Sequence, residues 1–133
     1  LAELPGDARY RTEAARHLKG LSRFIARGAM SYGSAAVERY LDVPKEVLIV
    51  HPDGAPKSDK LAAKFRSLYL PNALQFELAQ AQVEGLAKQV PWLKDKVAQD
   101  GQATAYVCEQ GVCQRPTNDP GEMARQLAEV ERF

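Results

Sequence analysis

The sequence predicts an α/β fold. An N-terminal helical hairpin precedes a small three- to four-stranded, mostly parallel sheet with flanking helices and a C-terminal β-hairpin plus helix. Three observations predict this fold. Apolar residues recur at spacings of three and four near the N-terminus. A continuous apolar run and an alternating segment, both of strand length, flank a segment with helical spacing. A β-prone segment with a Gln110-Gly111 turn then leads into a strong helix start.

Residues 1–43 predict the helical hairpin. Asp7 fits the N-cap of a helix over residues 8–27, and the glycine-containing stretch 28–33 ends that helix. Ser34 fits the cap of a second helix that runs to Leu41. The expected inner positions are Ala14, Leu18, Leu21, Ile25 and Gly28, with Phe24 beside them, and in the second helix Ala36, Val37, Tyr40 and Leu41. His17 lies on the flank and is expected to face solvent. Because this pair is too small to bury its own faces, we expect it to dock on other parts of the protein.

Residues 44–133 predict a small α/β domain. The apolar run Glu46–Val50 is typical of a strand buried on both faces, as in a parallel sheet. A helix over residues 60–70 follows, and then a second, parallel strand over residues 73–78 that alternates apolar and polar residues and lies nearer an edge. The inner side of the helix is expected to carry Leu61, Ala62, Phe65, Leu68 and Tyr69.

The segment over residues 82–99 has helical spacing but contains a helix breaker. Pro91 should split or kink it, because proline lacks the amide that an interior helical position needs. Trp92 is expected to pack under this segment as part of the core. Asp100-Gly101 then predicts a turn before the next strand.

The β-prone residues 104–108 and the Gln110-Gly111 turn predict a hairpin with a two-residue loop. Such a loop places Cys108 opposite Cys113 in a non-hydrogen-bonded pair, with Cβ atoms roughly 4.5–5.5 Å apart. This distance is close to what a disulfide requires. The cysteines therefore fit three interpretations: reduced thiols that pack as small apolar side chains, a structural or redox disulfide, or a metal site. The C-x4-C spacing and the distance of both histidines in the sequence speak against a metal site.

The last helix has a clear start. Asp119 fits an N-cap, Pro120 fits the first helical position, and Glu122 stands where a capping box places its acidic residue. The helix is expected to run to about Arg132, with an apolar stripe that comprises Met123, Ala124, Leu127, Ala128 and Val130.

Composition bounds the classes of function. The 133 residues are 45% hydrophobic and 26% charged, which is typical of one soluble globular domain. The formal net charge is +1 and no basic patch stands out, so neither nucleic acid nor a membrane is expected as a partner. Two cysteines make no disulfide scaffold, which favours a reducing, cytoplasmic location. The start at Leu1 rather than Met suggests a fragment of a longer protein or a processed chain.

One group of polar residues is a candidate ligand site. In open α/β sheets, ligands favour the carboxyl ends of parallel strands, where this sequence places His51, Asp53, Lys57 and either Glu77 or Gln80. His51, in a loop after the first strand, is the best candidate for a general base, although an exposed loop histidine is the plainer interpretation. The sequence has no phosphate-binding glycine loop and no nucleophile elbow. No catalytic residue and no cofactor is therefore expected.

A longer pattern resembles a known family. It consists of Tyr106-Val-Cys108-x4-Cys113-Gln-x-Pro116-x-x-Asp119-Pro120, preceded by Asp100-Gly101-x-Ala103-Thr-Ala. This pattern resembles the carboxyl terminus of the large thioredoxin-domain-containing proteins of the spermatogenesis-associated type. Three further segments resemble that family in the same order: Gly6–Arg11, Pro44–Val50 and Tyr69–Asn72.

The resemblance implies a longer protein. Members of this family have an N-terminal thioredoxin-like domain, a six-hairpin (α/α) toroid similar to sugar epimerases and glycosidases, and then a tail. Residues 1–43 would be the last helices of the toroid and residues 44–133 the C-terminal α/β domain. The implied partners are the remaining domains of the parent chain, with a homo-oligomer as a further possibility.

Three hypotheses for function follow. The first is a non-catalytic accessory or interaction domain, for which the fragment alone is not an enzyme. The second is a thiol-redox module that uses Cys108 and Cys113, in which Arg115 favours the thiolate and Glu109 opposes it. The third is a small-molecule, sugar-related binding site at His51 and Asp53.

Overall fold

The computed structural model describes residues 8–28, 31–42, 44–55 and 60–128. The chain divides into two compact units, Leu1–Pro44 and Lys45–Phe133, and each is described by itself. The N-cap predicted at Asp7 and the predicted end of the last helix, with Val130, lie outside the described residues.

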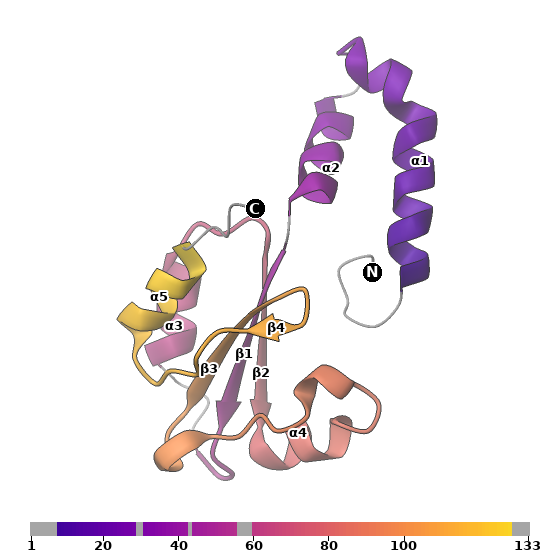
Figure 1. Ribbon diagram of the computed structural model, residues 1–133. Coiled ribbons are helices and arrows are strands. Elements are labelled where there is room, and N and C mark those ends of the chain that lie inside the picture. Colours follow the sequence, from indigo (N-terminus) through magenta and orange to yellow (C-terminus); the bar gives the residue numbers. More distant parts are fainter. Residues whose placement is uncertain (1–7, 29–30, 43, 56–59, 129–133) are drawn as a thin grey trace. The chain divides into compact units, whose positions relative to one another are not determined.

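The first unit is a pair of helices, α1 (Ala8–Ala26) and α2 (Ser31–Leu41), which lie side by side (Figure 1). Helix α1 ends where predicted: Gly28 has a φ of +68°, and its amide donates to the Ile25 carbonyl at 3.0 Å. The Arg11 guanidinium lies 5.0 Å from the centre of the Tyr40 ring and joins the two helices.

The start of α2 differs from the prediction. The helix begins at Ser31, so Ser34 lies inside it and is not its cap. Gly33 also lies inside the helix and is buried. Gly33 therefore does not belong to the break between the helices, which the sequence predicted over the whole stretch 28–33. Gly28 ends the first helix, because its left-handed backbone conformation is one that other residues rarely adopt.

The second unit is a four-stranded sheet with helices on both faces (Figure 1). The strand order is β2-β1-β3-β4. The elements in chain order are β1 (Lys45–His51), α3 (Lys60–Ser67), β2 (Ala73–Ala79), α4 (Gln80–Leu86), the 3-10 turns η1 (Pro91–Leu93) and η2 (Gln99–Gly101), β3 (Thr104–Glu109), β4 (Val112–Cys113) and α5 (Pro120–Ala128).

The α/β class is confirmed, but the sheet is mixed and not mostly parallel. Strand β1 pairs with β2 in parallel, with β3 antiparallel, and β3 pairs with β4 antiparallel. The reason lies in the connection after β2. Helix α4 starts directly where β2 ends, and Thr104 at the start of β3 pairs with Val50 near the end of β1. The connection from β2 to β3 therefore stays at the carboxyl ends of β1 and β2. Because β3 starts at that same end, it must run in the opposite direction to β1 and β2.

The core has one layer on each face of the sheet. Helices α3 and α5 cover one face, and α4 with the turns that follow covers part of the other (Figure 1). The first layer comprises Val47, Ile49, Leu61, Ala62, Ala105, Val107, Met123 and Leu127. The second comprises Leu48, Val50, Val83, Leu93, Tyr106 and Cys108. Since alternate residues of β1 enter both layers, the prediction of a strand buried on both faces is confirmed.

Several boundaries differ from the predicted ones. Helix α3 ends at Ser67 and not at residue 70, and the predicted inner residue Tyr69 is 92% exposed. Pro91 splits its segment as expected, because it opens η1 after the end of α4. Trp92 is half-buried and packs against Phe76, with ring centroids 6.0 Å apart.

Candidate functional site

The hairpin β3–β4 has the predicted register. Cys108 is opposite Cys113, and Glu109 is opposite Val112. The two loop residues, Gln110 and Gly111, have φ values of +51° and +82°. Positive φ at both loop positions defines the turn type whose twist matches that of the flanking strands, which explains why this short loop closes the hairpin.

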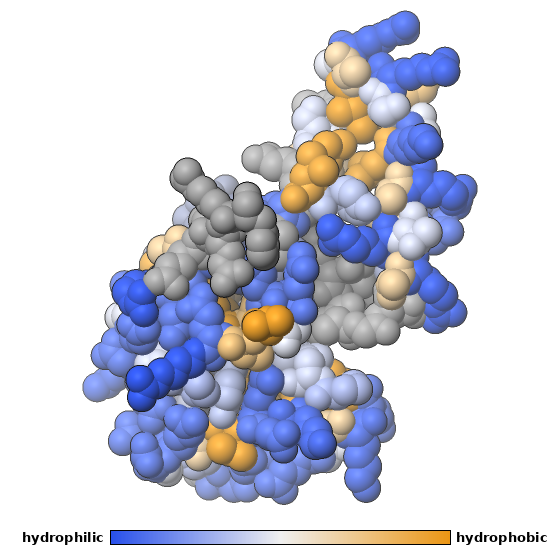
Figure 2. Space-filling model, in the orientation of Figure 1, coloured by the Kyte–Doolittle hydropathy of each residue, from blue (hydrophilic) through white to orange (hydrophobic). Residues whose placement is uncertain are grey.

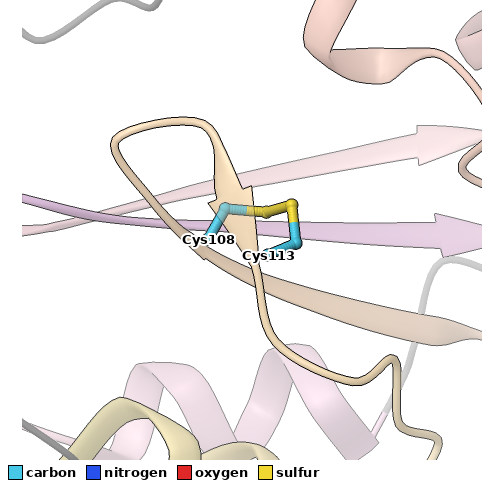
Figure 3. Close-up of a disulfide and its surroundings, with 2 residues drawn as sticks. All are labelled: Cys108 and Cys113. Atoms are coloured by element: carbon cyan, nitrogen blue, oxygen red, sulfur yellow. A yellow bond between two sulfur atoms is a disulfide. The ribbon is translucent and has the colours of Figure 1, made fainter. Parts of the chain in front are cut away.

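The two cysteines form a disulfide (Figure 3). Their Cα atoms are 3.9 Å apart, and no free cysteine remains in the chain. Cys108 is 1% exposed, whereas Cys113 is half-buried. Of the three interpretations, the structure therefore has the disulfide. No cluster of residues suited to a metal ion occurs among the described residues.

Glu46 lies beside this disulfide. It is the partner of Cys108 in the antiparallel pairing of β1 with β3, so the two side chains extend from the same face of the sheet. The Glu46 side chain is buried, and its Oε2 atom has no hydrogen-bond partner. Burial raises the pKa of this carboxyl above its ordinary value.

Sequence reasoning treated Glu46 only as the first residue of an apolar strand and missed it as a site residue. A signal was present, because an acidic residue inside a strand expected to be buried on both faces is unusual. The sequence did not show that this residue pairs with Cys108, since that depends on the register between two distant strands.

A groove runs along the same hairpin. Its volume is about 410 Å³, and its lining comprises Lys45, Val107, Cys108, Glu109, Gln110, Val112, Cys113 and Gln114. Lys45 extends from the start of β1 and donates a hydrogen bond from Nζ to the Gln126 carbonyl at 3.2 Å. Gln126 in turn donates from Nε2 to the Arg115 carbonyl at 2.9 Å. The first bond joins the start of β1 to α5, and the second joins the chain after the hairpin to the same helix.

The environment of His51 differs from the predicted one. It is the last residue of β1 and is buried, so it is neither a loop residue nor exposed. Its Nε2 atom lies 3.4 Å from Glu77 Oε2. The other oxygen of Glu77 accepts hydrogen bonds from Arg66 at 3.2 Å and from Gln75 at 2.9 Å. The histidine thus belongs to an interstrand polar cluster. The strand extends further than the apolar run suggested, because β2 pairs with it as far as Ala79.

Asp53 and Gln80 lie near the same edge, as predicted, but both hold the backbone. The Asp53 carboxylate accepts a hydrogen bond from the Ala81 amide at 3.0 Å, in the first turn of α4. The Gln80 side chain accepts one from the Ala98 amide at 2.8 Å. Lys57 lies outside the described residues. A ligand-binding role for His51 and Asp53 stays a prediction. His17 is exposed, as expected.

The fold and the disulfide hairpin define a small α/β module, and one comparison relates it to a known protein. The chain is 31% identical over 83 residues to human spermatogenesis-associated protein 20. The aligned part is 62% of this chain and 11% of the human protein, so the chain spans a small fraction of that relative's length. No family model and no solved structure matches the chain. Among the described residues, no helix has the length and apolar character required to cross a membrane.

Proposed function

We propose that this chain is a non-catalytic accessory region at the carboxyl end of a larger protein, and that α1 and α2 pack against other helices of that same polypeptide. The similarity to spermatogenesis-associated protein 20, of which the chain spans 11%, supports a longer parent protein. The resemblance described above extends the proposal. The other helices would be those of an (α/α) toroid, in a protein that also carries a thioredoxin-like domain.

The exposure of apolar side chains on α1 and α2 is the observation that supports this proposal most directly. Helix α1 has 19 residues, and none of them is buried. Leu21 of the predicted stripe and Phe24 beside it are 39% and 57% exposed, and Leu41 of α2 is 73% exposed. The other apolar side chains of the stripe are half-buried, namely those of Ala14, Leu18 and Ile25. Apolar side chains are visible on the surface of the helical pair (Figure 2). An apolar stripe at helical spacing indicates a face that packs, and the pair α1 and α2 by itself leaves part of that face open.

Oxidative footprinting of aromatic and aliphatic side chains tests the proposal. Hydroxyl-radical labelling is measured for the 133-residue chain and for the longer parent polypeptide that contains it. We expect strong labelling of Leu21 and Phe24 in the short chain and strong protection in the long one. Tyr69 of the second unit, which is 92% exposed, serves as an internal control. Equal labelling in both proteins contradicts the proposal, and protection that rises with the concentration of the short chain assigns the face to a second copy.

A second candidate function is a thiol-redox element formed by Cys108 and Cys113. The observation that favours it is the disulfide itself, which joins a buried cysteine to a half-buried one. The more exposed Cys113 offers a reductant access, and a two-residue hairpin holds both cysteines together after reduction. Such an element would suit a parent protein that also carries a thioredoxin-like domain.

Redox titration tests this second function. The chain is equilibrated in dithiothreitol buffers of graded potential, its thiols are alkylated, and its intact mass is measured. We expect the disulfide and dithiol forms to interconvert within roughly −320 to −180 mV, where cellular dithiol systems operate. If the disulfide stays closed even at the most reducing end of this range, it is a structural crosslink, and the proposed redox function is wrong.

A further inference from the structure

Glu46 is a buried acidic residue that lies beside the disulfide. The residue is 4% exposed, and the Oε2 atom has no hydrogen-bond partner. An isolated carboxylate in such a place is costly, and holding a proton lowers this cost. Burial raises the pKa of Glu46 in accord with that expectation. The position therefore provides a carboxyl group that can carry a proton.

The sulfur that could use this proton is close by. Glu46 and Cys108 are direct partners across β1 and β3, and the Cβ atoms of such partners lie roughly 4.5–5.5 Å apart on one face of a sheet. Cys108 is the buried sulfur of the disulfide. When a disulfide breaks, the buried sulfur leaves as a thiolate in surroundings that disfavour charge.

We propose that Glu46 donates a proton to the Cys108 sulfur when the Cys108–Cys113 disulfide is reduced, and takes that proton back when the disulfide re-forms. This inference rests on the second proposed function, the thiol-redox element. It assigns the two cysteines different roles: Cys113 meets the reductant, and Cys108 is the leaving group that Glu46 serves.

The reductant is a dithiol. One of its thiolates attacks Cys113 Sγ and forms a mixed disulfide, and the bond between Cys113 Sγ and Cys108 Sγ breaks with its electron pair on Cys108 Sγ. The carboxyl group of Glu46 protonates that thiolate. The second thiolate of the reductant then attacks the reductant's other sulfur, which is bonded to Cys113 Sγ in the mixed disulfide. The reductant becomes an internal disulfide, and Cys113 leaves as a thiolate. Water protonates Cys113, and Glu46 remains a carboxylate until re-formation of the disulfide returns the proton of Cys108 to it.

Few other described titratable groups face this pair. On the same face, the neighbour of Glu46 on β2 is Leu74, and the next pair along β1 and β3 is Leu48 with Tyr106. The Tyr106 hydroxyl is bonded to the backbone of Val97, and Lys96 Nζ lies 5.6 Å from the centre of its ring. Lys45 and Glu109 are adjacent in sequence to the pair, but alternation along the strands places them on the opposite face.

The test compares Glu46→Gln (E46Q) with Glu109→Gln (E109Q) in the 133-residue chain. E109Q is the matched control, because it removes a carboxylate next to Cys108 from the other face. Reduction by dithiothreitol is followed across the pH range in which the chain stays folded, and each rate constant is divided by the thiolate fraction of dithiothreitol. In the wild type, we expect the corrected rate constant to fall as Glu46 loses its proton at rising pH.

In E46Q, we expect a corrected rate constant that is independent of pH and, at the acidic end, lower on the order of 100-fold, as for the loss of a positioned acid. E109Q should keep the wild-type profile. Glu46→Asp (E46D) keeps a carboxyl group, so its corrected rate constant should still fall with rising pH, which a merely structural role would not require. If E46Q does not fold, E46D replaces it in the comparison with the wild type. If the wild-type disulfide resists reduction, both the redox function and the role of Glu46 are wrong. If it is reduced and E46Q keeps the wild-type profile, only the role of Glu46 is wrong.

Discussion

The hydroxyl group of Tyr106 forms two hydrogen bonds with one residue, Val97. It accepts a bond from the Val97 amide at 2.9 Å and donates one to the Val97 carbonyl at 2.8 Å. Tyr106 lies in the middle of β3, and Val97 lies in the irregular segment between the turns η1 and η2. A single side chain thus satisfies both polar groups of a residue that no helix or strand includes, and it fastens the long connection to the sheet.

Tyr106→Phe removes that fastening and keeps the ring. The backbone amide and carbonyl of Val97 then lose their partner. At about 0.5–1.5 kcal/mol for each hydrogen bond, we expect the free energy of unfolding to fall by about 1–3 kcal/mol. Urea unfolding followed by circular dichroism measures this change. Tyr69→Phe is the matched control, since Tyr69 is almost fully exposed, and it should leave stability unchanged. An equal effect of the two variants would contradict the structural role of the hydroxyl.

Asp119 caps the last helix, as the sequence predicted. Its Oδ1 atom accepts a hydrogen bond from the Glu122 amide at 2.7 Å. Asp119→Ala should lower the free energy of unfolding by about 1 kcal/mol, whereas Asp119→Asn, which keeps an acceptor, should be nearly neutral. Thermal unfolding of both variants checks this pair. A similar loss in both would show that the charge of Asp119 matters and its hydrogen bond does not.

The predicted capping box is incomplete, and the reason is local. The Asp119 amide donates to Thr117 Oγ1 at 3.1 Å, and the Glu122 carboxylate accepts two hydrogen bonds from Arg125, at 2.6 and 2.9 Å. Glu122 therefore does not return to the cap. The hydrogen bond with Arg125 holds the pKa of Glu122 below its ordinary value.

The hairpin turn offers a pair of substitutions with opposite effects. Gly111 has a φ of +82°, so Gly111→Ala should cost about 1–2 kcal/mol, the penalty of a left-handed conformation for an L-residue with a side chain. Gln110 has a φ of +51° in the position that asparagine prefers in this turn, so Gln110→Asn should stabilise the chain. Urea unfolding with the disulfide intact measures both. A neutral Gly111→Ala variant would argue against the turn described here.

Stability should depend on pH through Glu46. Its folded-state pKa is raised by burial, so its contribution to stability is fully present below the ordinary value of 4.5 and is lost as the pH rises through the folded-state pKa. E46Q lacks this dependence. We therefore expect the free energy of unfolding of E46Q minus that of the wild type to increase with pH and then to level off.

Urea unfolding of the two proteins at a series of pH values tests this expectation. Glu122 acts in the opposite direction, because a lowered pKa gives stability that is lost as the pH falls, but it is common to both proteins and cancels in the difference. E109Q again serves as the control for the loss of one charge. A difference between E46Q and the wild type that is constant with pH would mean that Glu46 titrates alike in the folded and unfolded chains.

Local signals in the sequence determined much of the second unit. The turn at Gln110-Gly111 set the loop length, and the loop length set the pairing of Cys108 with Cys113. The cap at Asp119 and the split at Pro91 are likewise confirmed, because each depends on groups within a few residues of one another. Such interactions are encoded in neighbouring positions, so one sequence is sufficient to predict them.

Only the tertiary structure decided the direction of β3 and the surroundings of the polar residues. The sheet is mixed because the connection from β2 to β3 stays at one end of the strands, and no local propensity specifies the path of that connection. The same pairing brings Glu46 beside Cys108, although 62 positions (108 − 46) separate them in the sequence. The parallel pairing with β2 extends β1 to His51, which is buried next to Glu77. The physical reason is that burial and strand register depend on which distant segments meet.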